Sequence, residues 1–228
     1  MFKIGHYTDI NNITGCTVIL MPSDTIGSCY VAGSSPGTRE TELLSPERKI
    51  NEIHAVLLTG GSAFGLNAVA GVVKFLEEKN IGYKTKHSII PIVPAAVIYD
   101  LNIGNSKLRP DAENAYFACQ NAKVNNDEQG NIGAGTGATA GKWAGIPYAM
   151  KSGLGIAELK YQDVFIKVIS VVNAVGDIID ENGDIICGAI NSQHKFLAKS
   201  DHKIRWQPPE IGFGENTVLS VIMTNAKI

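Results

Sequence analysis

The chain has 228 residues, of which 44% are hydrophobic and 18% are charged, and its formal net charge is −2. This length and composition allow a large buried core, so we expect one α/β domain over residues 1–228, or less simply two small ones. Because 20 basic and 22 acidic residues are spread along the chain, neither nucleic acid nor an anionic membrane is suggested as a partner.

The beginning of the chain and its cysteines and histidines narrow the class further. Residues 1–9, MFKIGHYTD, lack the apolar core of a signal peptide, and no run approaches the roughly 18 apolar residues of a membrane-spanning helix, so we expect a cytoplasmic protein. No C-x-x-C or H-E-x-x-H pattern occurs, so we expect buried reduced thiols, no metal and no cofactor. The four cysteines are Cys16, Cys29, Cys119 and Cys187.

The first third of the chain predicts strands followed by one strong helix. Residues 15–33 indicate a strand, a turn at residues 22–24 and a second strand, and residues 33–44 indicate a surface loop whose Arg39 either reaches a site or is a solvated charge. A short strand at residues 54–58 then turns through Gly60 and Gly61 into a helix that ends near residue 80. Its apolar residues recur at helical spacing: Phe64, Ala68, Val69, Val72, Val73 and Leu76.

The glycines of that turn have two explanations. A Gly-Gly-Ser turn at the start of a helix can bind an anion, or the glycines can serve close packing of helix on strand, which we prefer. Further on, residues 89–101 are typical of an edge or irregular strand because Pro91 and Pro94 interrupt them. A second helix is expected from Pro110 onward, with small residues on its packed face.

Residues 131–145, NIGAGTGATAGKWAG, are the most unusual stretch in composition. They match neither the Walker pattern nor the dinucleotide-binding fingerprint, because their glycines fall at other positions. Small residues allow a backbone to approach a substrate or another strand closely. Lys142 is therefore a candidate for a buried amine with a lowered pKa near a nucleophile, and its small neighbours leave little for its long side chain to pack against.

A long β-branched run at residues 164–175 predicts a central strand, and Asn173 is the one polar exception near its end. A buried side-chain amide must find partners, so Asn173 is either a structural clamp on loop backbone or an orienter of an oxyanion and a nucleophile. Residues 180–184 predict a hairpin turn leading into residues 185–190, and residues 192–207 predict an exposed excursion.

The last stretch, residues 206–228, runs from a loop rich in Gly and Pro into an apolar strand at Thr217. A Thr at this place is often simply a strand former. If the bond between Asn216 and Thr217 were cut, however, Thr217 would carry both a hydroxyl nucleophile and its own α-amine as general base. Such an amine has a pKa of about 7.7–8.0, so a useful fraction is neutral near neutral pH.

The chain resembles the L-aminopeptidase/D-esterase family, which includes β-peptidyl aminopeptidases and nylon-oligomer hydrolases. The resemblance covers about residues 4–228 and is carried by GHYTD, PGTRETELL, LLTGGSAFGLNA, PIVPAAVIYDL, RPDA, GAGTGATAGK, VVNAVGD and ENTVLSVIMTNA. It implies a four-layer αββα sandwich of the N-terminal-nucleophile-hydrolase type that assembles as a homo-oligomer.

The same resemblance assigns roles to the candidate residues. It implies self-cleavage between Asn216 and Thr217, with Thr217 as the new nucleophile and Asn173 as amide orienter. Lys142 becomes a nearby amine, and Tyr99 a wall or hydrogen-bond donor. Residues 1–216 would correspond to the larger subunit and residues 217–228 to the first strand of the smaller one.

The departure from the family lies at the C-terminus, where only 12 residues follow the cut and the rest of the smaller subunit is lacking. We therefore expect the bond to stay mostly intact in this chain and to be cut in a completed counterpart. Two functions remain open: an amide hydrolase or aminopeptidase acting on small peptides or amino-acid amides, or a non-catalytic binding protein that keeps fold and pocket.

Overall fold

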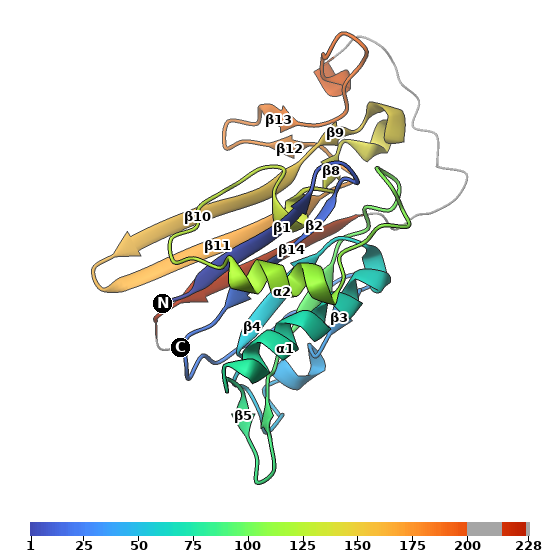
Figure 1. Cartoon of the computed structure of the whole chain (residues 1–228). Helices are drawn as coiled ribbons and strands as arrows, with labels where there is room; N and C mark the ends of the chain where they lie inside the picture. Colours follow the sequence, from blue (N-terminus) through green and yellow to red (C-terminus); the bar gives the residue numbers. More distant parts are fainter. Residues whose placement is uncertain (200–215, 227–228) are drawn as a thin grey trace.

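A computed structural model describes residues 1–199 and 216–226 of the chain (Figure 1). Within these residues the fold is mixed α/β. The helices are α1 (Val69–Glu78) and α2 (Ala112–Gln120). The strands are β1 (Lys3–Asp9), β2 (Thr14–Leu20), β3 (Thr38–Arg39), β4 (Ala55–Thr59), β5 (Tyr83–Lys84), β6 (Ile89–Ile90), β7 (Ala95–Val97), β8 (Thr139–Ala140), β9 (Met150–Lys151), β10 (Gly153–Tyr161), β11 (Val164–Asn173), β12 (Ile178–Ile179), β13 (Ile185–Cys187) and β14 (Thr217–Thr224). Short 3₁₀ helices span Glu42–Leu44, Ser62–Ala68, Gly133–Gly135, Lys142–Ala144, Ile146–Tyr148 and Leu197–Lys199.

The larger sheet has five strands in the order β1-β2-β4-β7-β3. β1 and β2 form an antiparallel hairpin, β2 pairs antiparallel with β4, and β4 pairs parallel with β7 across the connection that contains α1. Alternation along the strands sends side chains to both faces, and both faces are buried. On β2, for example, Cys16 and Val18 face one core while Ile19 faces the other.

Helices α1 and α2 cover one face of this sheet, and both lie side by side across it (Figure 1). α2 begins with a capping box, in which Asp111 accepts from the Asn114 main-chain N–H and Asn114 accepts from that of Asp111. The two helices approach closely because α1 has Gly71 at the contact, where a Cβ atom would lie 1.8 Å from the Ala112 carbonyl oxygen.

The other face packs against a three-stranded antiparallel sheet in the order β10-β11-β14. The core between the two sheets contains Ile19 and Leu58 from the first sheet and Ile169 and Val171 from the second. Residues 133–138, called here the Gly-rich loop, lie in the same layer, since Ala134 and Ala138 belong to that core. The described residues therefore form helix, sheet and sheet layers, as expected for an αββα sandwich.

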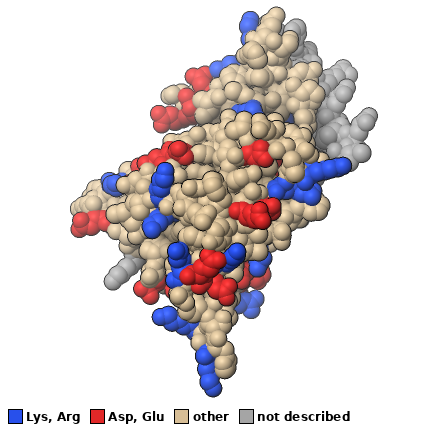
Figure 2. All heavy atoms as spheres, viewed as in Figure 1, with Lys and Arg blue, Asp and Glu red and all other residues tan. Residues whose placement is uncertain are grey.

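The outer face of the three-stranded sheet is apolar and open. The exposed fraction is 66% for Leu159, 57% for Val218 and 70% for Ile222. No helical layer covers this face among residues 1–199 and 216–226. Acidic and basic side chains are interspersed over the face of the molecule drawn in Figure 2, and neither sign forms a continuous field there.

Several expectations from the sequence require correction. The first hairpin joins β1 to β2, so residues 15–33 hold one strand, and the expected second strand is an exposed irregular segment. Phe64 precedes the α-helix, in a 3₁₀ helix, where it is 60% exposed and stacks on the guanidinium of Arg109 instead of packing in the core. β7 lies between β4 and the two-residue β3 rather than at the edge. Cys29 is exposed, whereas the other three free thiols are buried.

Other expectations are confirmed. β11 is the central strand of its sheet. The helix after Pro110 buries Ala115, Ala118 and Cys119. The turn at residues 180–184 connects β12 to β13 and is closed by Asp180, which accepts from the main-chain N–H groups of Asn182 and Asp184. The expected excursion at residues 192–207 lies mainly outside the described residues.

Candidate active site

The pairing of β11 with β14 brings Asn173 and Thr217 together. The two residues are direct partners in the antiparallel register, at the end of β11 and the beginning of β14. Directly opposed residues point to the same face of a sheet with Cβ atoms about 4.5–5.5 Å apart. Asn173 is fully buried and Thr217 is partly buried. The sheet therefore places the predicted nucleophile beside the predicted amide.

Asn216 is also held at this corner. Its side-chain oxygen accepts a hydrogen bond from the main-chain N–H of Val175 at 3.3 Å. Val175 lies two residues beyond the end of β11, so the contact ties the residue before Thr217 to the segment that follows Asn173. The peptide bond between Asn216 and Thr217 is thus adjacent to Asn173 and the residues bonded to its amide, Lys142, Thr139 and Tyr99, which we call the Asn173 cluster.

Lys142 enters the cluster from the segment after the Gly-rich loop. Its ammonium donates to the Asn173 side-chain oxygen at 2.7 Å and to the Asn173 carbonyl oxygen at 3.2 Å. The segment is held by hydrogen bonds from the Gly141 N–H to the Gly176 carbonyl and from the Trp143 N–H to the Val175 carbonyl. A glycine is required before Lys142, because Gly141 has a φ of 76° and a Cβ atom there would lie 2.0 Å from the Ala189 nitrogen.

The side chain of Lys142 is only 8% exposed. The expectation that its small neighbours leave its long side chain with little to pack against is therefore wrong. The main chain on either side of Lys142 lies against segments distant in sequence, namely the turn after β11 and the stretch after β13. The burial of the side chain supports the expectation of a buried amine next to Asn173.

The Asn173 amide is oriented by four contacts. Its oxygen accepts from the Thr139 N–H at 3.2 Å and the Thr139 hydroxyl at 3.3 Å, in addition to Lys142. Its nitrogen donates to the Tyr99 carbonyl oxygen at 3.0 Å. Because three donors face one side and a carbonyl the other, the amide has one favourable orientation. Tyr99 contributes to this cluster through its main chain.

Both explanations offered for Asn173 are therefore compatible with the geometry. The amide clamps loop backbone through Thr139 and Tyr99. An amide nitrogen carries two hydrogens and the contact with Tyr99 uses one of them, so the clamp leaves the amide with further donor capacity.

Three polar residues near the Asn173 cluster were not predicted from the sequence. Thr139 is one, and the others are Lys151 and Asp100, which lie behind the Gly-rich loop. Asp100 is 3% exposed and binds the Thr14 hydroxyl at 2.8 Å and the Gly61 N–H at 2.7 Å. The sequence does offer one signal for Asp100: it is a carboxylate at the end of an apolar strand-like run, and a carboxylate buried there must find hydrogen-bond partners.

The Asp100 contacts also explain the Gly60-Gly61 turn. A Cβ atom on Gly60 would lie 2.1 Å from an Asp100 oxygen, and Gly61 has a φ of 85°. The anion near this turn is thus the protein's own carboxylate, and the glycines also serve close packing.

The pocket next to the cluster is small. It has a volume of about 120 Å³ and is lined by Asn102, Ile103, Thr139, Ile146, Ala149 and Lys151. Thr139 links it to Asn173. An apolar wall with a few polar groups, here formed by Ile103, Ile146 and Ala149 with Thr139 and Lys151, is typical of sites that bind small molecules.

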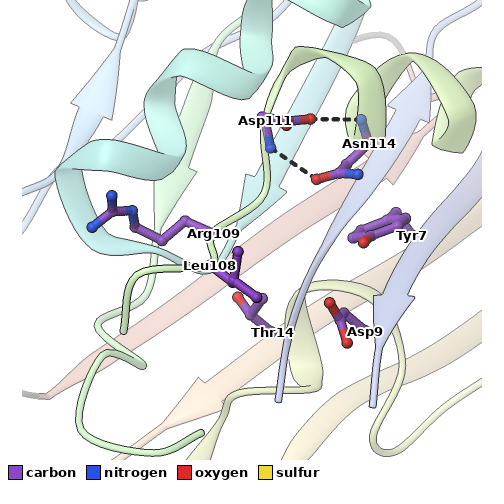
Figure 3. Close-up of a pocket in the computed structure, with 7 residues that line it drawn as sticks. All are labelled: Tyr7, Asp9, Thr14, Leu108, Arg109, Asp111 and Asn114. Atoms are coloured by element: carbon purple, nitrogen blue, oxygen red, sulfur yellow. Dashed lines mark hydrogen bonds between the residues drawn. The ribbon is translucent and has the colours of Figure 1, made fainter. Parts of the chain in front are cut away.

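A larger pocket of about 200 Å³ lies elsewhere, between the end of β1 and the start of α2 (Figure 3). It is lined by Tyr7, Asp9, Thr14, Leu108, Arg109, Asp111 and Asn114. Figure 3 shows that Arg109 extends away from the Asp111–Asn114 capping box. None of the predicted site residues lines either pocket, but Thr139 of the smaller one donates hydrogen bonds to Asn173, so the smaller pocket is the one next to the predicted site.

In residues 1–199 and 216–226, no group of three or more His, Cys, Asp or Glu side chains is arranged to hold a metal ion. No helix in the same part of the chain is long and apolar enough to cross a membrane.

Known proteins match this chain along nearly its whole length. The profile of peptidase family S58 matches residues 2–228. An uncharacterized aminopeptidase of Mycobacterium tuberculosis is 40% identical over 187 residues, which cover 78% of this chain and 52% of the relative. A 6-aminohexanoate-oligomer endohydrolase of Paenarthrobacter ureafaciens is 32% identical over 222 residues, covering 94% of this chain and 59% of that protein. The chain thus spans about half the length of the curated relatives it matches.

Solved structures support the fold. The L-aminopeptidase D-Ala-esterase/amidase of Ochrobactrum anthropi, described as a variant of the Ntn hydrolase fold, superposes with a TM-score of 0.68 at 18% identity. The match covers 98% of this chain and 61% of that one. A β-aminopeptidase of Burkholderia sp. gives a TM-score of 0.58 at 16% identity, over 77% of this chain and 51% of the other. At these identities the likeness concerns the fold alone.

Proposed function

The chain belongs to peptidase family S58, and from this premise we propose that it is the part of a self-processing amide hydrolase that carries the nucleophile Thr217. The observation that supports this most is the direct pairing of Thr217 with Asn173, whose amide is held by Lys142. A nucleophile, an oriented amide donor and a cation then lie within one corner of the fold. This is the set of groups that amide hydrolysis by a terminal hydroxyl requires.

Processing comes first in the proposal. The Thr217 hydroxyl attacks the Asn216 carbonyl, the peptide C–N bond breaks, and an ester joins Asn216 to the Thr217 oxygen. Water then opens the ester and leaves a carboxylate on Asn216 and a free α-amine on Thr217. The products are residues 1–216 and a segment that begins at Thr217.

Turnover uses the same residues. The neutral α-amine of Thr217 takes the proton of its own hydroxyl as the oxygen attacks a substrate amide, and the resulting ammonium returns the proton to the leaving amine. The free hydrogen of the Asn173 amide stabilises the oxyanion. Lys142 supports this donor, because its amine donates to the side-chain oxygen of Asn173 and holds the amide in its orientation.

The proposed substrate is a small peptide or an amino-acid amide cut after its N-terminal residue. Relatives described as aminopeptidases match at 39–40% identity and oligomer endohydrolases at 32%. The adjacent pocket of about 120 Å³ suits a small side chain. A panel of amino-acid p-nitroanilides, short peptides and 6-aminohexanoate oligomers tests this, and turnover of the oligomers alone would contradict it.

Mass spectrometry and N-terminal sequencing test the hydrolase proposal. The complete gene, including any coding sequence that flanks this chain, is expressed and incubated. We expect a new terminus reading TVLSV, lost in Thr217→Ala and partly retained in Thr217→Ser and Thr217→Cys, because these keep a nucleophile. Absence of that terminus in the wild type would favour a binding protein without self-cleavage.

A further inference from the structure

Lys151, the last residue of β9, reaches back to the Gly-rich loop. Its ammonium donates to the carbonyl oxygens of Thr136 and Ala138, the latter at 3.0 Å. The Lys151 main chain is held in turn, since its carbonyl oxygen accepts from the Cys187 thiol at 3.3 Å. The ammonium therefore bridges the two residues on either side of Gly137.

Asp100 lies against the same part of the Gly-rich loop. A Cβ atom on Gly137 would lie 2.3 Å from an Asp100 carboxylate oxygen, so the loop backbone lies directly against that carboxylate. Asp100 is itself fixed by the Thr14 hydroxyl and the Gly61 N–H. The loop is thus confined between an anchored carboxylate and a partly buried ammonium.

The residue that follows this confined segment is Thr139, which orients Asn173. Both its N–H and its hydroxyl point to the Asn173 oxygen, at 3.2 and 3.3 Å. Thr139 is also the direct partner of Lys151 in the pairing of β8 with β9. Lys151 therefore acts on the position of Thr139 twice, through strand pairing and through the carbonyl group one residue before it.

We propose that Lys151 is a positioning residue for the candidate active site, whose ammonium fixes the Gly-rich loop so that Thr139 holds the Asn173 amide in place. Lys151 contacts neither Asn173 nor Thr217 through its ammonium, so its action passes through Thr139. The catalytic consequence rests on the proposed function. The positioning itself is a property of the fold and is measurable without any activity.

The protonation state of Lys151 can be changed by pH, which gives a second way to test its role. Burial lowers the pKa of Lys151 to about 8, while the negative charge of Asp100 opposes this shift and the Cys187 thiol opposes it further. Those two groups are the titratable neighbours that act on Lys151 among the described residues. Above this pKa the amine loses its charge, and its hydrogen bonds to the two carbonyl groups weaken.

Amide hydrogen exchange on the 228-residue chain tests the positioning directly. In Lys151→Met, the Thr139 N–H is expected to exchange roughly 10- to 100-fold faster, because charge-assisted hydrogen bonds to the loop are lost. Lys151→Arg should restore most of the protection. Lys167→Met is the control, since it removes an ammonium that is more buried than that of Lys151 and that pairs with Asp127 and Glu158 at the far end of β11. Equal Thr139 protection in wild type and Lys151→Met would overturn the proposal.

A titration of the wild type covers the case in which Lys151→Met does not fold. The ¹³C shift of the Lys151 ε-carbon reports its charge, and exchange at Thr139, corrected for intrinsic rates, is followed over the same pH range. We expect protection at Thr139 to fall as Lys151 deprotonates, while amides of β1 and β2 keep theirs. Constant protection at Thr139 through the Lys151 titration would refute the proposal.

Activity in the complete gene product separates this proposal from the proposed function. If the wild type turns over substrate, Lys151→Met should lower kcat about tenfold or more with little change in KM, and Lys151→Arg should recover rate and extend activity to higher pH. An unchanged kcat in Lys151→Met would contradict positioning. If the wild type is inactive, the proposed function fails, and the exchange measurements alone decide the role of Lys151.

Discussion

Replacing Asn173 with Leu tests how much the Asn173 cluster contributes to stability. Leu has the same branched shape, with methyl groups in place of the amide oxygen and nitrogen, so the change removes the amide without opening a cavity. The Tyr99 carbonyl and the Thr139 N–H then lose the hydrogen bonds that they make at 3.0 and 3.2 Å. Lys142 keeps its contact with the carbonyl oxygen of residue 173 at 3.2 Å, because that contact is made to the main chain.

The expected loss follows from these two groups. A buried polar group left unpaired costs about 1–3 kcal/mol, so the free energy of unfolding should fall by about 2–6 kcal/mol. That is a large share of the roughly 5–15 kcal/mol that stabilises a typical domain. Urea unfolding followed by circular dichroism measures the change as a lower midpoint at an unchanged slope.

Ser170→Ala is the matched control on the same pair of strands. It removes the hydrogen bond between the Ser170 and Ser220 hydroxyls, 2.8 Å apart on the open face, where water can replace the lost partner. Its effect should stay within about 0.5 kcal/mol. If Asn173→Leu cost no more than this control, the amide would not be a stabilising clamp, and its burial would have to be explained by catalysis alone.

Three other changes probe the layers around the site. Gly71→Ala should destabilise the fold by about 1–3 kcal/mol despite the better helix propensity of Ala, because the new methyl group meets the Ala112 carbonyl; thermal melting measures this. Burial lowers the pKa of His54, so the unfolded state binds the additional proton and the free energy of unfolding should decline as the pH falls below about 6.5. His54→Asn removes this proton binding. The decline between pH 7.5 and pH 5.5, measured by unfolding curves, should therefore be smaller than in the wild type by up to about 1.4 kcal/mol per pH unit below 6.5. Cys29 should react fastest with a thiol reagent in the native state, whereas burial raises the pKa of Cys119 to about 12 and protects it; retention of the fast phase in Cys29→Ser would disprove this.

The sequence allowed the main parts of the fold to be predicted where periodicity was strong. The small-residue helix face and the β-branched central strand were found because each repeats one pattern over about ten residues. The β1–β2 hairpin was assigned one strand too late, since residues 3–9 alternate weakly and include polar side chains. Phe64 was misplaced because helical spacing does not reveal where a 3₁₀ turn gives way to an α-helix.

The site was partly accessible to the same reasoning. Asn173 was found because it is a polar residue in an apolar strand, and its proximity to Thr217 and Lys142 could be inferred only from the family resemblance. Lys151 could not be found, because a lone lysine after a methionine resembles any surface residue. Its role depends on contacts with carbonyl groups 13 and 15 positions earlier, which no local pattern encodes.

The order of Asn173 and Thr217 along the chain has a consequence for the timing of synthesis. Forty-four positions separate them, and ribosomes add about 5–20 residues per second, so about 2–9 s pass between the two. β10 and β11 are joined by a two-residue turn, and such hairpins form in about 1–10 μs. The β10–β11 hairpin and the Asn173 amide can therefore form before Thr217 is synthesised. β14 then completes the site by pairing with β11, a strand that already exists.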